Sequence, residues 1–444
     1  MTLRSLALVC CLLLAGCTAP VAPSPTPADD RLGVENGYAA SDSLDVDASD
    51  GLNESELDAV VARTMARVEL IRGLEFEHTV PVEVISRAEY RNGTSRDTTV
   101  DTPGERAREQ RYEAAMLVGE DRTVGGAFAE IYGGSVLGYY SSSADRIVLV
   151  SSNETPTVDR ATLAHELMHA LQDQRLSLLG GADNQDAAMA QTGVVEGDAN
   201  YVEAQYEERC DDEWECIPRP EGSSASSLDD RNFGLYLTVY APYSEGPTFV
   251  HRAHQRGGVD AVNELYTRPP QSSEQLIHPG DYPEDRPKRV VVPDRSTSEF
   301  DRATPATVGE ATLFAMLYQQ GAIERSSLTE DPGPYSAYNY SHPATAGWDG
   351  DKLVPYFDAD SDDPAADGYV LKTRWESERD ARQFEQAYRG MLTDELNATA
   401  EGEDVYRVPE GSFEDAFRVT REGDTVRIVN APSVSALDEV RRGT

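Results

Sequence analysis

The sequence predicts an α+β fold, with a core built from a mixed sheet and helices and a second α+β region after it. Residues 162–174 place leucine, alanine and methionine around two histidines without proline, which predicts a buried helix. Segments 136–140 and 146–150 precede this helix and are typical of short strands. A further strand is predicted at 369–375 and a hairpin over 413–429. A chain of 444 residues can bury a sizeable core and form two domains.

The first residues resemble an export signal. Arg4 precedes an apolar run, residues 6–14, that is too short to span a bilayer as a stable helix. Small residues then lead to Cys17, as at the processing site of a lipoprotein. We therefore expect residues 1–16 to be removed and Cys17 to carry a lipid that anchors the protein at the extracellular face of the membrane. A plain secretory signal with an incidental cysteine is the alternative.

The composition is strongly acidic. The chain has 39 basic and 79 acidic residues, a formal net charge of −40, and this charge is spread along the whole sequence. Such a charge repels phosphates and excludes nucleic acid as a partner. It is typical of a halophilic protein, because high salt screens the self-repulsion. Outside the N-terminal segment, Cys210 and Cys216 flank a short acidic loop that a disulfide could close outside the cell.

Composition also predicts the domain organisation. Residues 17–52 are rich in proline, alanine, serine and aspartate, which predicts a disordered tether. Folding is predicted to start at the capping pair Asn53 and Glu56 and to continue through a catalytic region, 53–280. A polar, proline-rich stretch then predicts a boundary before a C-terminal α+β region, 281–444.

The apolar helix carries a His-Glu-Leu-Met-His sequence. His165 and His169 are one helical turn apart, so both imidazoles leave the same face and can bind one zinc ion. Glu166 lies beside them and can take a proton from a water molecule that the ion activates. Zinc also needs a third protein ligand and an open position. Glu196 on the next predicted helix is the candidate, and Asp198 is the alternative.

Other residues are candidates for supporting roles. Gly197 allows the second ligand helix to pack closely against the first. His278, at a predicted helix end, could stabilise an oxyanion, and Tyr240 and Tyr243 are alternatives for that role. One strand of the 136–150 hairpin could pair with an extended substrate, although a purely structural hairpin fits the pattern equally well.

Two further groups have weaker patterns. His251 and His254 are three residues apart, but no acid with fitting spacing accompanies them, so a helix surface is the expected location. Asp349 and Asp351 could bind calcium, although a turn around the packed Trp348 is the more ordinary interpretation.

The candidate ligands resemble the gluzincin group of zinc metallopeptidases. In that group, two histidines on one helix and a glutamate on the next hold the metal, as His165, His169 and Glu196 would here. The sequence from Glu196 to Glu203 is similar to the ligand helix of zinc aminopeptidases. The group often has an acid one turn after the glutamate ligand, where this chain has Asn200. The resemblance therefore implies that Asn200 accepts a hydrogen bond from His165.

The wider chain resembles uncharacterised zincin-like surface lipoproteins of halophilic archaea over residues 163–174, 272–279 and 347–351. The resemblance implies a zincin-like core, with an edge strand, an active-site helix and a second ligand helix. It implies hydrolysis of a peptide or protein substrate with zinc as cofactor. The Gly-x-Met-Glu-Asn strand that grips a substrate amino terminus is absent, which favours an endopeptidase. A non-catalytic surface-binding or assembly protein with structural zinc, and a calcium-dependent adhesion protein, are the alternatives.

Overall fold

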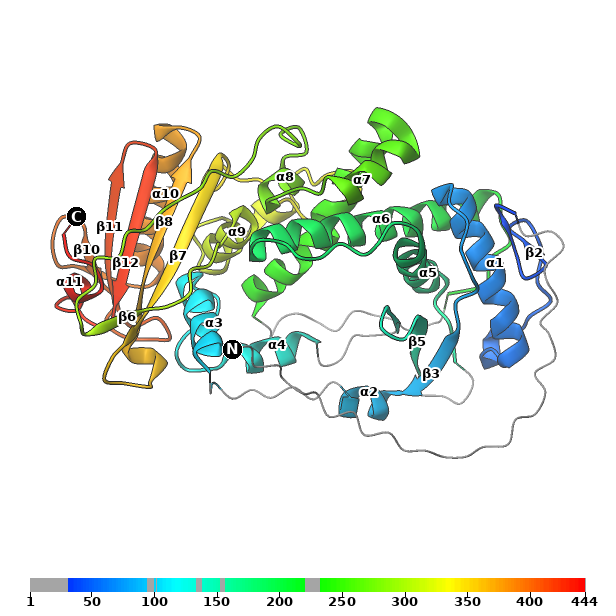
Figure 1. Cartoon of the computed structure of the whole chain (residues 1–444), viewed down its shortest axis with the longest axis horizontal. Helices are drawn as coiled ribbons and strands as arrows, with labels where there is room; N and C mark the ends of the chain where they lie inside the picture. Colours follow the sequence, from blue (N-terminus) through cyan, green and yellow to red (C-terminus); the bar gives the residue numbers. More distant parts are fainter. Residues whose placement is uncertain are drawn as a thin grey trace, which may run out of the picture.

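The protein has a mixed α+β fold in the computed structural model (Figure 1). The structure describes residues 31–93, 100, 102–132, 138–151, 156–219 and 232–443. A seven-stranded sheet forms one end of the molecule and helix α1 lies near the other, with helices α5 to α9 between them.

The helices in the described residues are α1 (Glu54–Arg72), α2 (Arg87–Gly93), α3 (Pro103–Ala114), α4 (Val124–Tyr132), α5 (Arg160–Arg175), α6 (Gln185–Asp212), α7 (Phe233–Thr267), α8 (Ser273–Ile277), α9 (Glu310–Gln319), α10 (Glu378–Gly390) and α11 (Leu437–Val440). The strands are β1 (Val34–Glu35), β2 (Tyr38–Ala39), β3 (Val82–Ser86), β4 (Gly138–Ser141), β5 (Arg146–Ser151), β6 (Phe300–Arg302), β7 (Trp348–Asp358), β8 (Gly368–Trp375), β9 (Thr399–Ala400), β10 (Val405–Arg407), β11 (Ala416–Glu422) and β12 (Thr425–Ala431).

Two sheets organise the chain beyond the β1–β2 hairpin. The smaller sheet has the order β3-β5-β4, with β3 parallel and β4 antiparallel to β5, so it is mixed and β4 lies at an edge. The larger sheet has the order β6-β7-β8-β12-β11-β10-β9, and its neighbouring strands are antiparallel. The small sheet and α1 cover α5, whereas the large sheet belongs to the C-terminal region.

The prediction of a disordered tether is wrong for residues 31–52, the part of it that the structure describes. Residues 31–52 include the β1–β2 hairpin, which packs on α1. The Gly33 N–H donates to the Glu69 carboxylate at 2.8 Å, and Arg67 Nε donates to the Ala40 carbonyl at 2.8 Å. Buried charges on α1 therefore obtain partners from this segment, which composition alone does not reveal. Residues 1–16, Cys17 and the tether up to residue 30 lie outside the described residues.

Local sequence signals set the start of the helices that carry the site. The predicted capping box of Asn53 and Glu56 is present at α1. At α5, the Asp159 side chain accepts hydrogen bonds from the backbone N–H groups of Ala161 and Thr162. The apolar side chains of α5 are fully buried, as predicted; these are Leu163, Ala164, Leu167, Met168, Ala170 and Leu171.

Helix α6 crosses α7 at a contact between glycines. A Cβ atom at Gly197 would overlap the backbone of Gly246, and one at Gly246 would overlap the Gly193 carbonyl. The sequence correctly marked Gly197 as a close approach but assigned the wrong partner, because the neighbouring backbone belongs to α7 and not to α5. Residues 233–243 form the start of α7.

Gly197→Ala is expected to destabilise the protein by about 1–3 kcal/mol, because the added methyl group must push two helix backbones apart. Gly104→Ala is the matched control. Gly104 lies in α3, and a Cβ atom added there would meet only the Thr102 hydroxyl, at 3.9 Å. That change should stabilise the helix by about 0.5–1 kcal/mol. Chemical denaturation measures the free energy of unfolding of each variant. Equal stability of the two variants would contradict the close contact between α6 and α7 at Gly197.

The predicted boundary at 281 does not separate two hydrophobic cores. One apolar cluster contains Leu237 on α7 and Ile277 on α8 together with Trp348 and Phe417 of the large sheet. The two regions therefore share a core. The Ser272 side chain, directly before α8, makes no capping hydrogen bond to that helix. Within the described residues, no helix combines the length and apolarity needed to cross a membrane.

Candidate metal centre

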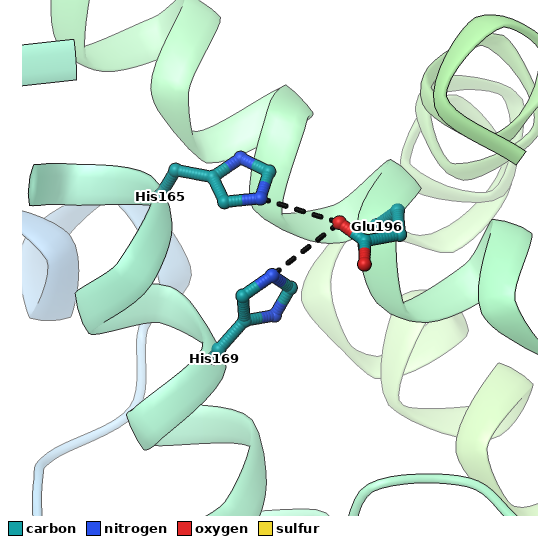
Figure 2. A group of neighbouring side chains, drawn as sticks. All are labelled: His165, His169 and Glu196. Carbon is teal, nitrogen blue, oxygen red and sulfur yellow. Dashed lines mark hydrogen bonds and ion pairs between the residues drawn. The ribbon is translucent and has the colours of Figure 1, made fainter. Parts of the chain in front are cut away.

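His165, His169 and Glu196 meet between α5 and α6 (Figure 2). The Glu196 Oε2 atom lies 3.2 Å from His165 Nε2 and 3.3 Å from His169 Nε2. The two rings are nearly perpendicular, with centroids 4.6 Å apart. All three side chains are partly buried, and two imidazoles with one carboxylate form a donor set that could hold a divalent metal ion.

The second nitrogen of each imidazole also has a partner. His165 Nδ1 lies 3.2 Å from Glu203 Oε2, and His169 Nδ1 lies 2.8 Å from Gln172 Oε1. These acceptors favour a proton on Nδ1, so each Nε2 faces the shared position and could offer its lone pair to an ion there. Pairs of this kind orient histidines that bind metals.

The predicted partner of His165 was Asn200, and this prediction is wrong. The partner is Glu203, two turns after Glu196 on α6. Positions four and seven residues after Glu196 both lie near its face of the helix, and the crossing of α6 over α5 decides which one reaches the ring. Gln172 was missed, although its spacing of three residues from His169 on one helix was a usable signal.

The electrostatics of the metal-free site follow from these contacts. Burial lowers the pKa of His165, but its contacts with the Glu196 and Glu203 carboxylates outweigh burial and raise it to about 10. Burial raises the pKa of Glu196, and the two imidazoles more than reverse this and hold it well below its usual value. In the absence of an ion, a proton thus occupies the region between these donors, and a bound cation would displace it.

Glu166 connects α5 to the edge of the small sheet. Its Oε2 atom accepts a hydrogen bond of 2.8 Å from the backbone N–H of Tyr140 on β4. The Tyr140 hydroxyl lies 2.9 Å from an oxygen of Asp145 and 2.9 Å from one of Asp173 and shares its one proton between them, which fixes this strand against α5. The carboxylate next to the metal site and the sheet edge therefore have a fixed relative position. The predicted strand over 136–140 is described from residue 138 onward.

Of the three candidates for an oxyanion donor, Tyr243 reaches the site. Its hydroxyl donates to Glu196 Oε1 at 3.1 Å. Tyr240 stacks on Tyr243, with ring centroids 6.0 Å apart, and continues an aromatic row along α7. His278 was the preferred candidate, but its Nε2 pairs with the buried Glu310 on α9 at 3.1 Å. The end of α8 packs toward α9, so the prediction for His278 is not supported.

Asp198, the alternative third ligand, faces away from the histidines. It forms a buried ion pair with Arg72 at 3.0 Å and accepts a hydrogen bond of 2.8 Å from the Tyr266 hydroxyl. Tyr266 in turn accepts a hydrogen bond from Gln172 at 2.8 Å. Asp198 therefore lies at the far end of a hydrogen-bonded chain that supports His169, and it is not part of the candidate metal centre.

The remaining predicted groups have structural partners. The partly buried rings of His251 and His254 on α7 lie at tilted angles to the Tyr201 ring of α6, with centroids 5.8 and 5.5 Å away. The Asp351 carboxylate accepts hydrogen bonds from the backbone N–H groups of Val308 and Gly309 and from the indole of Trp348, which supports the packed-tryptophan interpretation.

Two charged partners surround Asp349 at the start of β7. Lys288 Nζ lies 2.6 Å and Arg374 Nε 3.4 Å from its carboxylate. These ion pairs leave calcium binding at this position without support. Cys210 and Cys216 form a disulfide, as the sequence predicts.

A cavity of about 390 Å³ adjoins the site along α6 and α7. Tyr243 and Thr192 line it close to Glu196, and Arg108 and Arg111 of α3 contribute positive charge in an otherwise acidic protein. It is large enough for a side chain of a bound peptide.

Comparison with known proteins gives one partial match. A family model described as a domain of unknown function, DUF8575, matches residues 297–441, which contain the seven-stranded sheet. No curated protein and no solved structure matches the chain. The three residues of the candidate metal centre all precede the matched region.

Proposed function

We propose that the protein is a zinc-dependent peptidase, with His165, His169 and Glu196 as the metal ligands. The convergence of both Nε2 atoms on one carboxylate oxygen supports this function most directly. Two imidazoles and one carboxylate are a ligand set of catalytic zinc sites, which keep one position open. Zinc, when bound, would supply a Lewis acid that polarises a carbonyl group and lowers the pKa of a water molecule.

Glu166 is the proposed general base. It takes a proton from the attacking water as the new carbon–oxygen bond forms, and it returns that proton to the leaving amine as the carbon–nitrogen bond breaks. Its hydrogen bond to the Tyr140 N–H holds the carboxylate beside the edge strand β4. An extended peptide paired with that edge would bring its backbone to Glu166. Tyr243 is the proposed donor to the oxyanion, because its hydroxyl already reaches Glu196.

The proposed location is the outer face of the cell membrane, with a lipid on Cys17. The disulfide between Cys210 and Cys216 supports an oxidising compartment. The gluzincin-like ligand arrangement and the zincin-like core are part of the same proposal. The edge strand and the two ligand helices support it.

Metal content after exhaustive dialysis tests the proposed ligands. We expect one zinc ion per native chain and none in His165→Ala, because the remaining imidazole and carboxylate hold the ion too weakly. His254→Ala is the matched control, since this histidine lies on the surface of α7 near Tyr201 and should leave the zinc content unchanged. Equal zinc in native protein and His165→Ala would overturn the assignment.

A further inference from the structure

Three carboxylates converge at a second position, between α3 and the large sheet. Glu113 lies on α3, Glu120 in the segment after it, and Asp415 directly before β11. One oxygen from each lies within 4.8 Å of the others. Glu113 and Asp415 are 7% and 3% exposed, whereas Glu120 is open to solvent. The group therefore has two buried members and one member that faces water.

This negative charge lacks a basic partner. Within the described ranges, no arginine, lysine or histidine forms an ion pair with Glu113, Glu120 or Asp415. Burial and the neighbouring carboxylates raise the pKa of Asp415 to about 8 and that of Glu120 to about 7. Like charges this close in a buried site require a proton or a cation between them.

Several buried oxygens at the group also lack a donor. Asp415 Oδ2 accepts a hydrogen bond of 2.7 Å from the Asn430 amide, but no donor in the described part of the chain reaches Asp415 Oδ1. The side-chain oxygens of Asn430 and Gln110, both fully buried, also have no hydrogen-bond donor in the part of the chain that the structure describes. The Gln110 amide donates to Glu113 at 2.7 Å, so it adjoins the carboxylates. One proton shared by Glu113 and Asp415 would bridge these two carboxylates but would leave the Asn430 and Gln110 oxygens without a donor.

We propose that Glu113, Glu120 and Asp415 bind a calcium ion. The available donors are carboxylate oxygens, which are hard ligands that suit calcium and not a transition metal. The three carboxylates can supply up to about six oxygens, and water would complete the roughly six to eight that calcium takes. A cavity of about 530 Å³ lies beside the site. The acids Glu113, Glu120, Glu109 and Asp363 line it together with Arg122, which pairs with Glu130.

The ion would join the two halves of the chain. The segment after α3 already contacts the turn before β11, where the Glu120 N–H donates to the Ser412 carbonyl at 3.0 Å. A Cβ atom at Gly119 would overlap Ser412, so the two segments are in direct backbone contact. Calcium bound by Glu113 and Asp415 would therefore fasten α3 to the region that the family model matches.

Calcium binding to the full, zinc-saturated chain tests the proposal by equilibrium dialysis. The solution should contain about 1 M KCl, to screen the diffuse attraction of the acidic surface. We expect one saturable calcium ion per chain and a calcium-dependent rise of the unfolding temperature. Asp415→Asn should weaken calcium binding by at least about 10- to 100-fold. A loss of that size is typical even for a residue that only hydrogen-bonds to a metal ligand.

Two further variants make the result decisive. Glu120→Gln removes an exposed ligand without disturbing the core, and it should weaken binding even if Asp415→Asn fails to fold. Glu410→Gln is the matched control, because it removes the same charge from an exposed side chain in the segment before β11. It should bind calcium as the native chain does. Absence of a saturable ion, or native affinity in Glu120→Gln, would overturn the site. Neither outcome depends on peptide hydrolysis.

Discussion

Glu166→Gln is expected to reduce peptide hydrolysis by about 10²- to 10⁴-fold, because the amide cannot accept the proton of the attacking water. The zinc content should not change, since Glu166 is not among the three converging ligands. The fold should also persist, because a glutamine oxygen can still accept the hydrogen bond from the Tyr140 N–H. Turnover of a broad peptide library, measured together with zinc content, separates loss of the base from loss of the metal.

Glu208→Gln provides the control for this experiment. It is the same substitution on α6, at an exposed residue whose side chain accepts a hydrogen bond from Gln205. Native turnover in this variant would show that the charge change alone is harmless. If the native protein and Glu166→Gln are equally inert toward the library while both retain zinc, the peptidase proposal fails. A non-catalytic surface protein with structural zinc would then explain the site.

Glu203→Ala is expected to weaken zinc binding by about 10- to 100-fold, with a smaller loss for Glu203→Gln. The Glu203 carboxylate fixes the proton on His165 Nδ1 and makes the opposite nitrogen a better donor. Glutamine preserves an acceptor but not the negative charge. The difference between the two variants therefore separates the orientation of the His165 ring from the basicity of its Nε2 atom. Competition with a chromophoric chelator measures the affinity of each variant.

Asn200→Ala distinguishes the observed partner of His165 from the one that the sequence predicted. Both residues lie on α6, but the structure pairs His165 with Glu203. Asn200→Ala should therefore retain native zinc affinity. A larger loss in Asn200→Ala than in Glu203→Ala would contradict this account of the site.

Features that depend on neighbouring residues in the sequence were predictable. The spacing of His165 and His169 fixes their common face in any α-helix, and the apolar residues between them indicate burial. The capping box at Asn53 and the disulfide between Cys210 and Cys216 are also local, because each depends on a short segment. Each of these predictions needed only the regular geometry of a helix or the short separation of two residues in the sequence.

Features that depend on how distant segments pack were decided only by the tertiary structure. The sequence alone could propose Glu196 or Asp198 as third ligand, and the crossing of α5 and α6 directs Glu196 to the histidines while Arg72 holds Asp198 on another face. The same crossing selects Glu203 over Asn200. Residues 31–52 fold because α1 offers them buried partners. Sequence spacing determines which side chains share a face, but packing between elements determines what that face meets.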